Sequence, residues 1–478
     1  MSEYRRQLFA RLRTSITAHV EPSKALDPKK YQTVVVSPRS YFAFTPLLAS
    51  TSVGTLEFRT ALEPIRTRRT NVSYFQGWAD RVDFKNKKIT VEEAIEDQGV
   101  STALVEDRHA KESKEERHKR REMEAMKGKL FDITYDKLIV TDVGDARKIR
   151  NRILACFEAA ALPTTTDEQR KQLLNFAIVG GGPTGIEFSA ELHDIITEDL
   201  ARIYPELIPF HKITVYDVAK KVLPMFDEKL AKYAMDTFAR EGIDIRTDHH
   251  VEDLRPGAPG QRPSTEGDHE VYTLKVKEQG EIGVGMVVWS TGLMQNPFVA
   301  HALSNVYEVP SDFRRLESPS DDPDSLHWRV KTDAKTGSVL TDTRLRMKLI
   351  AESEKEKKPE AIMRDVFVLG DCAIVEGTQY PATAQVASQK AYWLAKRLNK
   401  GDIDKSGFTW KNMGVMAYVG NWNALLQGGG TSGGISGRLA WIIWRGAYLT
   451  KSVSLRNKIL IPTYWAINWL FGRDISRF

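Results

Sequence analysis

Residues 175–188 read Asn-Phe-Ala-Ile-Val-Gly-Gly-Gly-Pro-Thr-Gly-Ile-Glu-Phe, and this stretch decides the fold. The apolar run 176–179 predicts a short buried strand of a parallel sheet, and 186–196 predicts the helix that follows it. Three glycines separate the two elements in G-x-G-x-x-G spacing: Gly180, Gly182 and Gly185. Glycines at these places allow a tight turn, a close approach of the backbone to a pyrophosphate, and packing of the helix on the strand. We therefore predict a dinucleotide site at the helix N-terminus; a glycine-rich loop without a ligand is the alternative.

The next predicted strand, 213–217, ends on Asp217. An acid at this place reads the hydroxyls of an adenosine ribose and repels a 2′-phosphate, so it favours NAD over NADP. The spacing from the glycines is longer than usual because the preceding helix is predicted to run on to Tyr204. Lys220 and Lys221 follow shortly after the acid and temper the preference for NAD.

The composition bounds the class of protein. A chain of 478 residues predicts two or three domains, and 41% hydrophobic with 28% charged residues is ordinary for a globular protein. A net charge of +6 over this length argues against a nucleic-acid partner. The only cysteines, Cys156 and Cys372, form no redox pair, which sets aside a flavoprotein disulfide reductase. The chain contains no run of 18 apolar residues, so the sequence predicts no membrane-spanning helix.

Elements outside the glycine turn are predicted from shorter patterns. The mixed-charge run 106–129 predicts a solvated helix, because Glu and Lys or Arg recur four residues apart. The remaining predictions are strands at 31–36, 81–91, 131–140 and 286–289, polar loops at 311–335 and 352–359, a hairpin at 337–345, and a helix at 382–398. A second apolar strand, 366–369, ends on Gly370 and Asp371. Such an acid can accept hydrogen bonds from the ribityl hydroxyls of a flavin; a turn with an N-cap Asp is the alternative.

With these elements placed, the chain resembles the type II (rotenone-insensitive, non-proton-pumping) NADH dehydrogenases of the fungal mitochondrial kind. The resemblance runs from about Leu26 to the end of the chain. The stretches that carry it are 35–48 (Val-Val-Ser-Pro-Arg-Ser-Tyr-Phe-Ala-Phe-Thr-Pro-Leu-Leu), 178–192, 288–292, 367–373, 384–389 (Ala-Gln-Val-Ala-Ser-Gln) and 449–478. The stretch Ala-Gln-Val-Ala-Ser-Gln at 384–389, following Gly-Asp-Cys-Ala at 370–373, is fairly specific to this family.

The resemblance implies an α/β fold with two Rossmann-like dinucleotide-binding domains of the pyridine-nucleotide flavoprotein reductase type. The implied division is an N-terminus 1–25, FAD-domain parts at 26–170 and 294–398, an NADH domain at 171–293 and a membrane-anchoring or dimerisation region at 399–478. It also implies flavin-dependent oxidation of NADH, electron transfer to ubiquinone without proton pumping, and a peripheral place on the mitochondrial inner membrane. Residues 1–25 resemble a mitochondrial transit peptide in part; a frayed polar start is the alternative.

The resemblance also implies roles for individual residues, with FAD and NADH as cofactors and no metal. NADH contacts are implied for Gly180, Gly182, Thr184, Gly185, Asp217 and Gly292. FAD contacts are implied for Ser37, Arg39, Pro46, Gly370 and Asp371. Glu187 would lie beside the nicotinamide and the flavin, while Gln385 and Gln389 would line the quinone pocket. Residues four apart share a helix face, which supports the last assignment; an ordinary polar helix surface is the alternative.

Two departures fall in the same FAD domain. The family opens with a strand and its own G-x-G-x-x-G turn for the ADP part of FAD, but residues 16–25 contain no glycine and include Pro22. After 138–140 the family continues into an Ala-x-Gly turn, whereas here 141–145 (Thr-Asp-Val-Gly-Asp) follows. Both losses have clean edges, which favours a mis-spliced or wrongly predicted product of a true dehydrogenase gene. The alternative function is an FAD-deficient, non-catalytic NADH-binding membrane protein.

The C-terminal residues predict a membrane contact. Trp441, Trp444 and Tyr448 recur at helical spacing, and Trp465, Trp469 and Phe471 repeat the pattern after Pro462. Amphipathic aromatic helices with basic flanks lie in the bilayer interface, and the only acid after Arg438 is Asp474, so anionic lipid should attract this end. Packing into the core or against a second copy in a homodimer is the alternative. The glycine-rich stretch 428–434 is predicted as a flexible connector.

Overall fold

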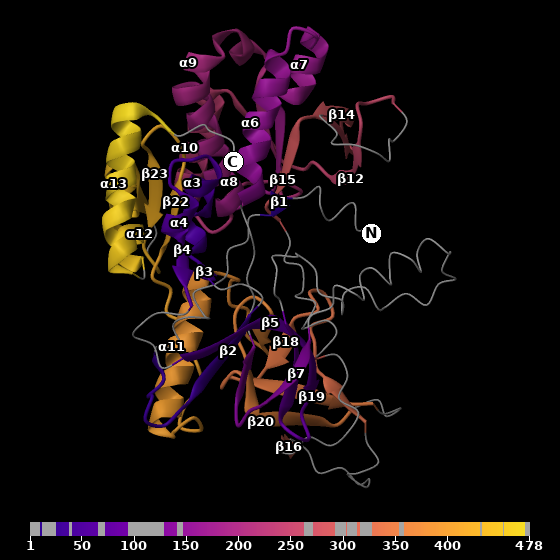
Figure 1. Ribbon diagram of the computed structural model, residues 1–478, viewed down its shortest axis with the longest axis vertical. Coiled ribbons are helices and arrows are strands. Elements are labelled where there is room, and N and C mark those ends of the chain that lie inside the picture. Colours follow the sequence, from indigo (N-terminus) through magenta and orange to yellow (C-terminus); the bar gives the residue numbers. More distant parts are fainter. Residues whose placement is uncertain are drawn as a thin grey trace.

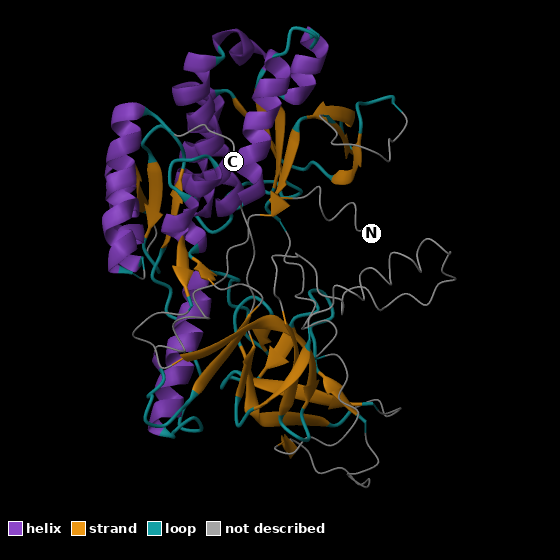
Figure 2. Ribbon diagram, in the orientation of Figure 1, coloured by secondary structure: helices purple, strands orange, loops and turns teal. Residues whose placement is uncertain are grey.

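Figure 1 shows an upper lobe rich in helices and a lower lobe rich in strands. The upper lobe holds residues around 147–291 with the C-terminal helices, and the lower lobe combines early strands with strands from the later part of the chain, which Figure 2 shows in orange. The computed structural model describes residues 10–11, 25–37, 41–65, 72–93, 129–140, 147–261, 271–291, 303, 313–315, 327–352, 358–430, 433–452 and 454–473.

A five-stranded parallel sheet forms the centre of the upper lobe, in the order β1-β15-β9-β10-β11. Its strands are β1 (Ala10–Arg11), β9 (Asn175–Val179), β10 (Lys212–Tyr216), β11 (Ile243–Arg246) and β15 (Met286–Trp289). Side chains of β9 alternate between two hydrophobic clusters, with Phe176 and Ile178 in one and Ala177 and Val179 in the other. Because both faces are buried, the strand is apolar throughout, which confirms the prediction from the sequence.

Helices cover one face of this sheet and a small antiparallel sheet covers the other. The helices of the lobe are α6 (Arg147–Ala161), α7 (Asp167–Leu173), α8 (Pro183–Asp194), the π-helix η3 (Ile195–Leu200), α9 (Ala201–Ile203), the 3₁₀-helix η4 (Pro205–Phe210) and α10 (Glu228–Glu241). The small sheet consists of β12 (Val251–Pro256), β13 (Tyr272–Val276) and β14 (Gly280–Val284). The long helix predicted to reach Tyr204 is confirmed as α8, η3 and α9 in succession, with a π-helical stretch that the sequence did not indicate.

The lower lobe contains two separate sheets. The larger one has the order β16-β20-β19-β18-β21, with β17 beside β19 and β8 beside β20. Its strands are β8 (Leu138–Val140), β16 (Phe313–Arg315), β17 (Trp328–Val330), β18 (Val339–Thr341), β19 (Arg346–Ala351), β20 (Glu360–Val368) and β21 (Ala373–Val375). The smaller one comprises β2 (Thr33–Ser37), β5 (Val72–Asp83), β6 (Lys88–Glu93) and β7 (Leu130–Thr134).

The C-terminal segment packs on the upper lobe. A three-stranded antiparallel sheet of β22 (Val415–Tyr418), β23 (Ala424–Gln427) and β24 (Gly434–Gly437) precedes helices α12 (Arg438–Lys451) and α13 (Leu455–Phe471). The short elements of residues 41–64, in indigo in Figure 1, pack between α13 and α8: β3 (Tyr41–Ala43), η1 (Thr45–Leu47), α3 (Leu48–Ser52), α4 (Phe58–Ala61) and β4 (Leu62–Pro64). Helix α11 (Ala384–Lys400) runs along the lower lobe.

Several sequence predictions need correction. The polar stretch 311–335 contains β16 and β17, and Trp328 is only 1% exposed because β17 pairs with β19. The hairpin predicted within 337–345 uses β18 and β19, so its second strand starts after Leu345. Within the stretch predicted as a flexible connector, Gly434 begins β24, a Cβ on Gly429 would overlap Asn412 O, and residues 431–432 lie outside the described residues. The run 81–91 forms the turn of a β5–β6 hairpin.

The aromatic stripe of α12 faces the protein and not the surface. Trp444 is 5% exposed and Tyr448 packs against the main core, because both lie over β22 and α8. Pro462 lies inside α13, which continues through it. Among the described residues no helix is long and apolar enough to cross a membrane. The predicted helix at 106–129 lies outside the described residues apart from Lys129, as do 12–24, 141–145, Arg39, Gly292 and Asp474.

Candidate functional site

The glycine turn between β9 and α8 is shaped by contacts that only glycine permits. Gly180 has φ +121°, and a Cβ there would overlap the side chain of Thr291. A Cβ on Gly185 would overlap the carbonyl oxygen of Gly180, so the first turn of α8 packs directly on the strand end. Gly182 differs, because nothing lies within 4 Å of an added Cβ. The turn therefore packs tightly at Gly180 and Gly185 and presents an open concave side at Gly182.

The open side faces the start of α8. Gly182 is the N-cap and makes no side-chain cap, and Pro183 occupies the first turn, where no amide hydrogen is needed. The remaining amides of the first turn, at the half-buried Thr184 among them, have no intrahelical acceptor and carry the positive end of the helix dipole. This arrangement suits an anion such as a pyrophosphate.

Asp217 lies beside the glycine turn, directly after β10. Its Oδ2 accepts a hydrogen bond from the Gly181 amide at 2.5 Å, and its Oδ1 accepts one from the Ala219 amide at 2.7 Å. The two adjacent parallel strands β9 and β10 bring the acid and the glycines to the same sheet edge. The structure thus brings together the two sequence features from which the dinucleotide site was predicted.

Glu187, on the first turns of α8, connects the glycine turn to the C-terminal region. Its Oε1 accepts hydrogen bonds from the Tyr418 amide at 3.1 Å and from Trp444 Nε1 at 3.2 Å. Desolvation by the surrounding protein is the main cause that raises the pKa of Glu187 to about 8. At neutral pH the carboxyl is therefore mainly protonated, and its hydroxyl can serve as a hydrogen-bond donor.

The residues implied for FAD lie in the lower lobe and between the lobes. Ser37 ends β2, Pro46 lies in η1, and Gly370 (φ +87°) and Asp371 follow β20. Lys390, which the sequence analysis missed, is 3% exposed on α11 and donates a hydrogen bond to Ala373 O at 3.3 Å. Burial lowers the pKa of Lys390 to about 8. These groups offer polar contacts of the kind that a ribityl chain or a flavin ring would use.

A cradle for the pyrophosphate of FAD is missing from the described part of the lower lobe. In the upper lobe the glycine-bearing β9 pairs with both β10 and β15. In the lower lobe β2 pairs with β5 and β8 pairs with β20, and no described strand joins the two sheets between them. The first glycine of the whole chain is Gly54, which lies after β2. The described residues therefore contain no glycine cradle for the ADP end of FAD.

Gln385 and Gln389 lie on one face of α11, as predicted, and both amides hold the segment 410–414. Gln385 Oε1 accepts hydrogen bonds from Trp410 Nε1 and the Met413 amide, each at 3.1 Å. Gln389 exchanges two hydrogen bonds with the backbone of Lys411, at 2.9 and 3.0 Å. The two side chains thus fix a loop next to the start of α11, a role that the sequence analysis did not foresee.

A row of acids along α8 and η3 was also missed. Glu187, Glu191, Asp194 and Glu198 are spaced four, three and four residues apart, which places them on one helix face. The spacing was readable from the sequence. Their main partners were not, because Ser50, Tyr418 and Arg473 come from distant parts of the chain. Among the described residues no group of three or more His, Cys, Asp or Glu is placed to hold a metal ion.

The chain is similar to known proteins along most of its length. Residues 18–306 match the family model of the pyridine nucleotide-disulphide oxidoreductases, and residues 412–474 match the NDH2 C-terminal domain. A probable NADH dehydrogenase of Dictyostelium discoideum is 33% identical, over 95% of this chain and 88% of its own length. The external NADH-ubiquinone oxidoreductase 2 of Saccharomyces cerevisiae mitochondria is 31% identical, over 95% and 79%. The structure of NDH2 from Plasmodium falciparum in complex with NADH shares the fold, with a TM-score of 0.71, 19% identity and coverage of 96% and 98%.

Proposed function

Because the chain belongs to the type II NADH dehydrogenases of the pyridine nucleotide-disulphide oxidoreductase family, we propose that it oxidises NADH and reduces ubiquinone. The family match covers more than half of the chain, and the relatives named for NADH-ubiquinone oxidoreduction align along nearly all of it. The observation in this structure that carries the proposal is the glycine turn with Asp217 beside it, joined through Glu187 to the C-terminal domain that marks this family.

We propose that NADH lies along the open side of the glycine turn. Its pyrophosphate would rest on the first-turn amides of α8, and Asp217 would accept hydrogen bonds from the adenosine ribose hydroxyls. Asp217 already holds the Gly181 and Ala219 amides, so its position is fixed before the ligand arrives. Gly292, also assigned to this site from the sequence, stays a prediction. The carboxyl of Glu187, mainly protonated at neutral pH, would offer a hydrogen-bond donor near the nicotinamide end.

FAD and NADH are the cofactors that the family implies. FAD, when bound, takes the hydride of NADH and passes the electrons on to the quinone. Ser37, Pro46, Gly370 and Asp371 are the described residues that we assign to its ribityl and ring end. Because the ADP end has no described cradle, we propose that this chain holds FAD weakly. The same observation favours the second candidate function, an FAD-deficient protein that binds NADH without catalysis.

The quinone is assigned to the region at the start of α11. Gln385 and Gln389 hold the segment 410–414 there, so we propose that this segment forms a wall of the quinone pocket and that the glutamines act on the quinone directly or through it. Gln385→Ala removes the acceptor for Trp410 Nε1 and the Met413 amide. We expect it to lower NADH-dependent ubiquinone reduction by about tenfold while NADH binding stays unchanged. Unchanged quinone turnover would contradict the assignment.

We propose that helices α12 and α13 dock on the mitochondrial inner membrane. Both expose large apolar side chains, with Ile442 59%, Ile459 61% and Phe471 81% exposed. Basic Arg438 and Lys451 flank α12, and anionic lipid would attract them. The mitochondrial names of the relatives agree with this place. A homodimer contact through the same exposed side chains is the alternative, and sedimentation of the detergent-free chain with and without vesicles distinguishes the two.

A further inference from the structure

A cavity of about 630 Å³ lies between η3 and the ends of α12 and α13, and we call it the C-terminal cavity. Its lining on α8 begins at Glu191, one turn beyond Glu187, and does not include the glycine turn. Its four carboxylates come from α8 and η3, and we call them the carboxylate wall; Arg445 and most of its tryptophans come from α12 and α13. Trp469 and Leu470 line it as well and are 71% and 62% exposed, so the cavity adjoins the apolar surface of α13.

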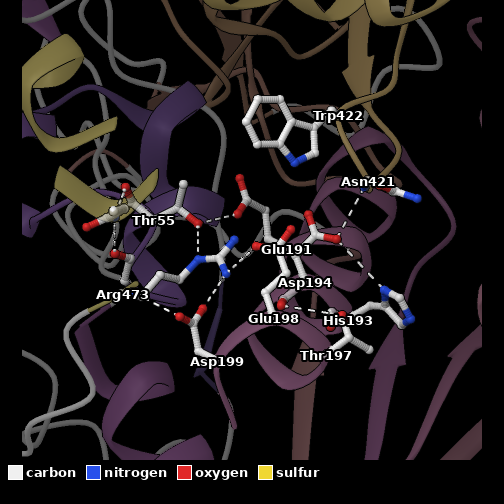
Figure 3. Close-up of polar contacts among 12 residues, drawn as sticks. Thr55, Glu191, His193, Asp194, Thr197, Glu198, Asp199, Asn421, Trp422 and Arg473 are labelled. Carbon is white, nitrogen blue, oxygen red and sulfur yellow. Dashed lines mark hydrogen bonds and ion pairs between the residues drawn. The ribbon is translucent and has the colours of Figure 1, made fainter. Parts of the chain in front are cut away.

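The carboxylates of this cavity are held in place by protein donors (Figure 3). Glu191 accepts hydrogen bonds from the hydroxyls of Ser50 at 2.5 Å and Thr55 at 2.6 Å. Arg473 donates to Glu198 Oε2 at 2.8 Å and to Asp199 Oδ2 at 2.5 Å, and it also reaches Thr55 Oγ1. The last residues of the described chain therefore fix one wall of the cavity as a rigid array of oxygen acceptors.

Arg445, on α12, has its guanidinium close to two indole rings. Its guanidinium carbon is 4.2 Å from the ring centre of Trp441 and 4.3 Å from that of Trp465. Its buried Nε has no hydrogen-bond partner among the described residues. Burial lowers the pKa of Arg445 to about 10, which leaves it charged at neutral pH. A guanidinium that stacks on aromatic rings can still donate in its own plane through its terminal nitrogens, and an oxygen anion is the partner that these donors suit.

The lining carries charged groups of both signs, so neither a simple anion nor a simple cation is attracted by all of them. It carries four carboxylates (Glu191, Asp194, Glu198 and Asp199) and three guanidiniums (Arg202, Arg445 and Arg473). A simple anion would be attracted by Arg445 but repelled by the carboxylates. A simple cation would be attracted by the carboxylates but repelled by Arg445. A ligand with a phosphate and a nearby ammonium group satisfies both kinds of group, because each charged end finds partners of opposite sign.

We propose that the C-terminal cavity binds the headgroup of a phospholipid with a primary amine, of the phosphatidylethanolamine type. The phosphate would lie on Arg445, and the ammonium would donate to the carboxylate wall. The acyl chains would leave the cavity past Trp469 and Leu470 and lie on the exposed apolar face of the helices. This inference rests on the proposed membrane docking of α12 and α13, since a lipid reaches the cavity from the bilayer surface.

The test is lipid binding to the full chain in detergent, measured by native mass spectrometry. The lipids are phosphatidylethanolamine, its N-methyl and N,N-dimethyl forms, phosphatidylcholine and phosphatidylglycerol. Each N-methyl group removes one donor, so we expect affinity to fall stepwise, and phosphatidylcholine should bind at least about tenfold more weakly than phosphatidylethanolamine. Arg445→Gln should weaken the binding of all these phospholipids, because it removes donors to the phosphate that they share. Arg456→Gln, which changes an exposed arginine of α13 outside the cavity, should keep the wild-type affinities.

Each other outcome overturns the proposal. Equal affinity for all the lipids would show that the amine is not read, and tighter binding of phosphatidylglycerol would show a site for anions alone. Soluble phosphoethanolamine that binds as tightly as the lipid would identify a free phosphate ester as the ligand. The comparison of phosphatidylethanolamine with its N-methylated forms uses the wild-type chain. It therefore tests the proposal even if Arg445→Gln does not fold. Sedimentation of the wild-type chain with phosphatidylcholine vesicles tests docking separately: docking without amine preference refutes this inference alone.

Discussion

In the part of the chain that the structure describes, the NADH region and the flavin region differ by one strand. In the NADH region β9 lies between β10 and β15 and carries the glycine turn at its end. In the flavin region the strands β2 and β8 form, but each pairs in a different sheet. The flanking strands therefore do not depend on the central one for their own pairing. We infer that a pyrophosphate cradle requires a central strand with its glycine turn, as β9 provides in the NADH region. The ends of the neighbouring strands can contact the rest of a dinucleotide without it.

The largest expected effect comes from the NADH turn itself. Gly185→Ala places a Cβ against the carbonyl oxygen of Gly180, so it should cost about 3 kcal/mol of folding stability as an overpacked site and abolish NADH binding. Thermal unfolding and NADH titration measure the two effects. Gly182→Ala is the matched control, because its Cβ meets no neighbour. It should keep the wild-type thermal midpoint and lose at least about tenfold in NADH affinity. Equal unfolding midpoints for the two variants would refute the packing argument.

A smaller effect concerns the flavin region. FMN lacks the AMP part of FAD and therefore has no pyrophosphate, and the described residues offer a pyrophosphate no cradle in the flavin region. We therefore expect the dissociation constants of FMN and FAD for this chain to agree within about tenfold. Quenching of flavin fluorescence during titration of the purified chain measures both constants. If FAD binds more than about a hundredfold tighter than FMN, residues outside the described part of the chain build a pyrophosphate site, and the contrast between the two regions disappears.

The smallest expected effect is the pH dependence due to Glu187, where the NADH region meets the C-terminal domain. Its pKa rises from 4.5 to about 8 on folding, so the folded chain binds a proton that the unfolded chain releases. This contribution to stability is fully present below about pH 4.5 and is lost as the pH rises towards about 8. Glu187→Gln, which mimics the protonated carboxyl, should flatten the fall in thermal midpoint across this window. The exposed Glu228→Gln serves as control and should keep the wild-type slope; equal slopes for wild type and Glu187→Gln would refute the assignment.

The sequence predicted those parts of the fold and the site that depend on neighbouring residues. The strand before Gly180, the turn, the helix after it and the acid at Asp217 all follow from local spacing. Trp328 was placed in a polar loop because its burial depends on β19, which follows later in the chain and has no local signal. Trp444 was placed at the membrane because α12 is apolar on two faces. Only the contact with Glu187, 257 residues away, shows which face turns inward.

The C-terminal cavity could not be predicted from the sequence either, because it is formed by contacts between residues far apart in the chain. The spacing of the acids from Glu187 to Glu198 shows one helix face, but the sequence does not show that Arg473 lies against it 274 residues beyond Asp199. Nothing local in the sequence indicates that the guanidinium of Arg445 lies close to two indole rings. Both contacts join residues that lie far apart in the sequence, so only the three-dimensional structure shows them.

The most direct test of the account is the visible absorbance spectrum of the purified, detergent-solubilised chain during titration with FAD, followed by addition of NADH. The account predicts little flavin absorbance at first, a bound-flavin band that grows with added FAD, and bleaching of that band by NADH. A chain that binds NADH but shows no bound flavin at any FAD concentration would contradict the proposed dehydrogenase activity and would identify the chain as a non-catalytic NADH-binding protein.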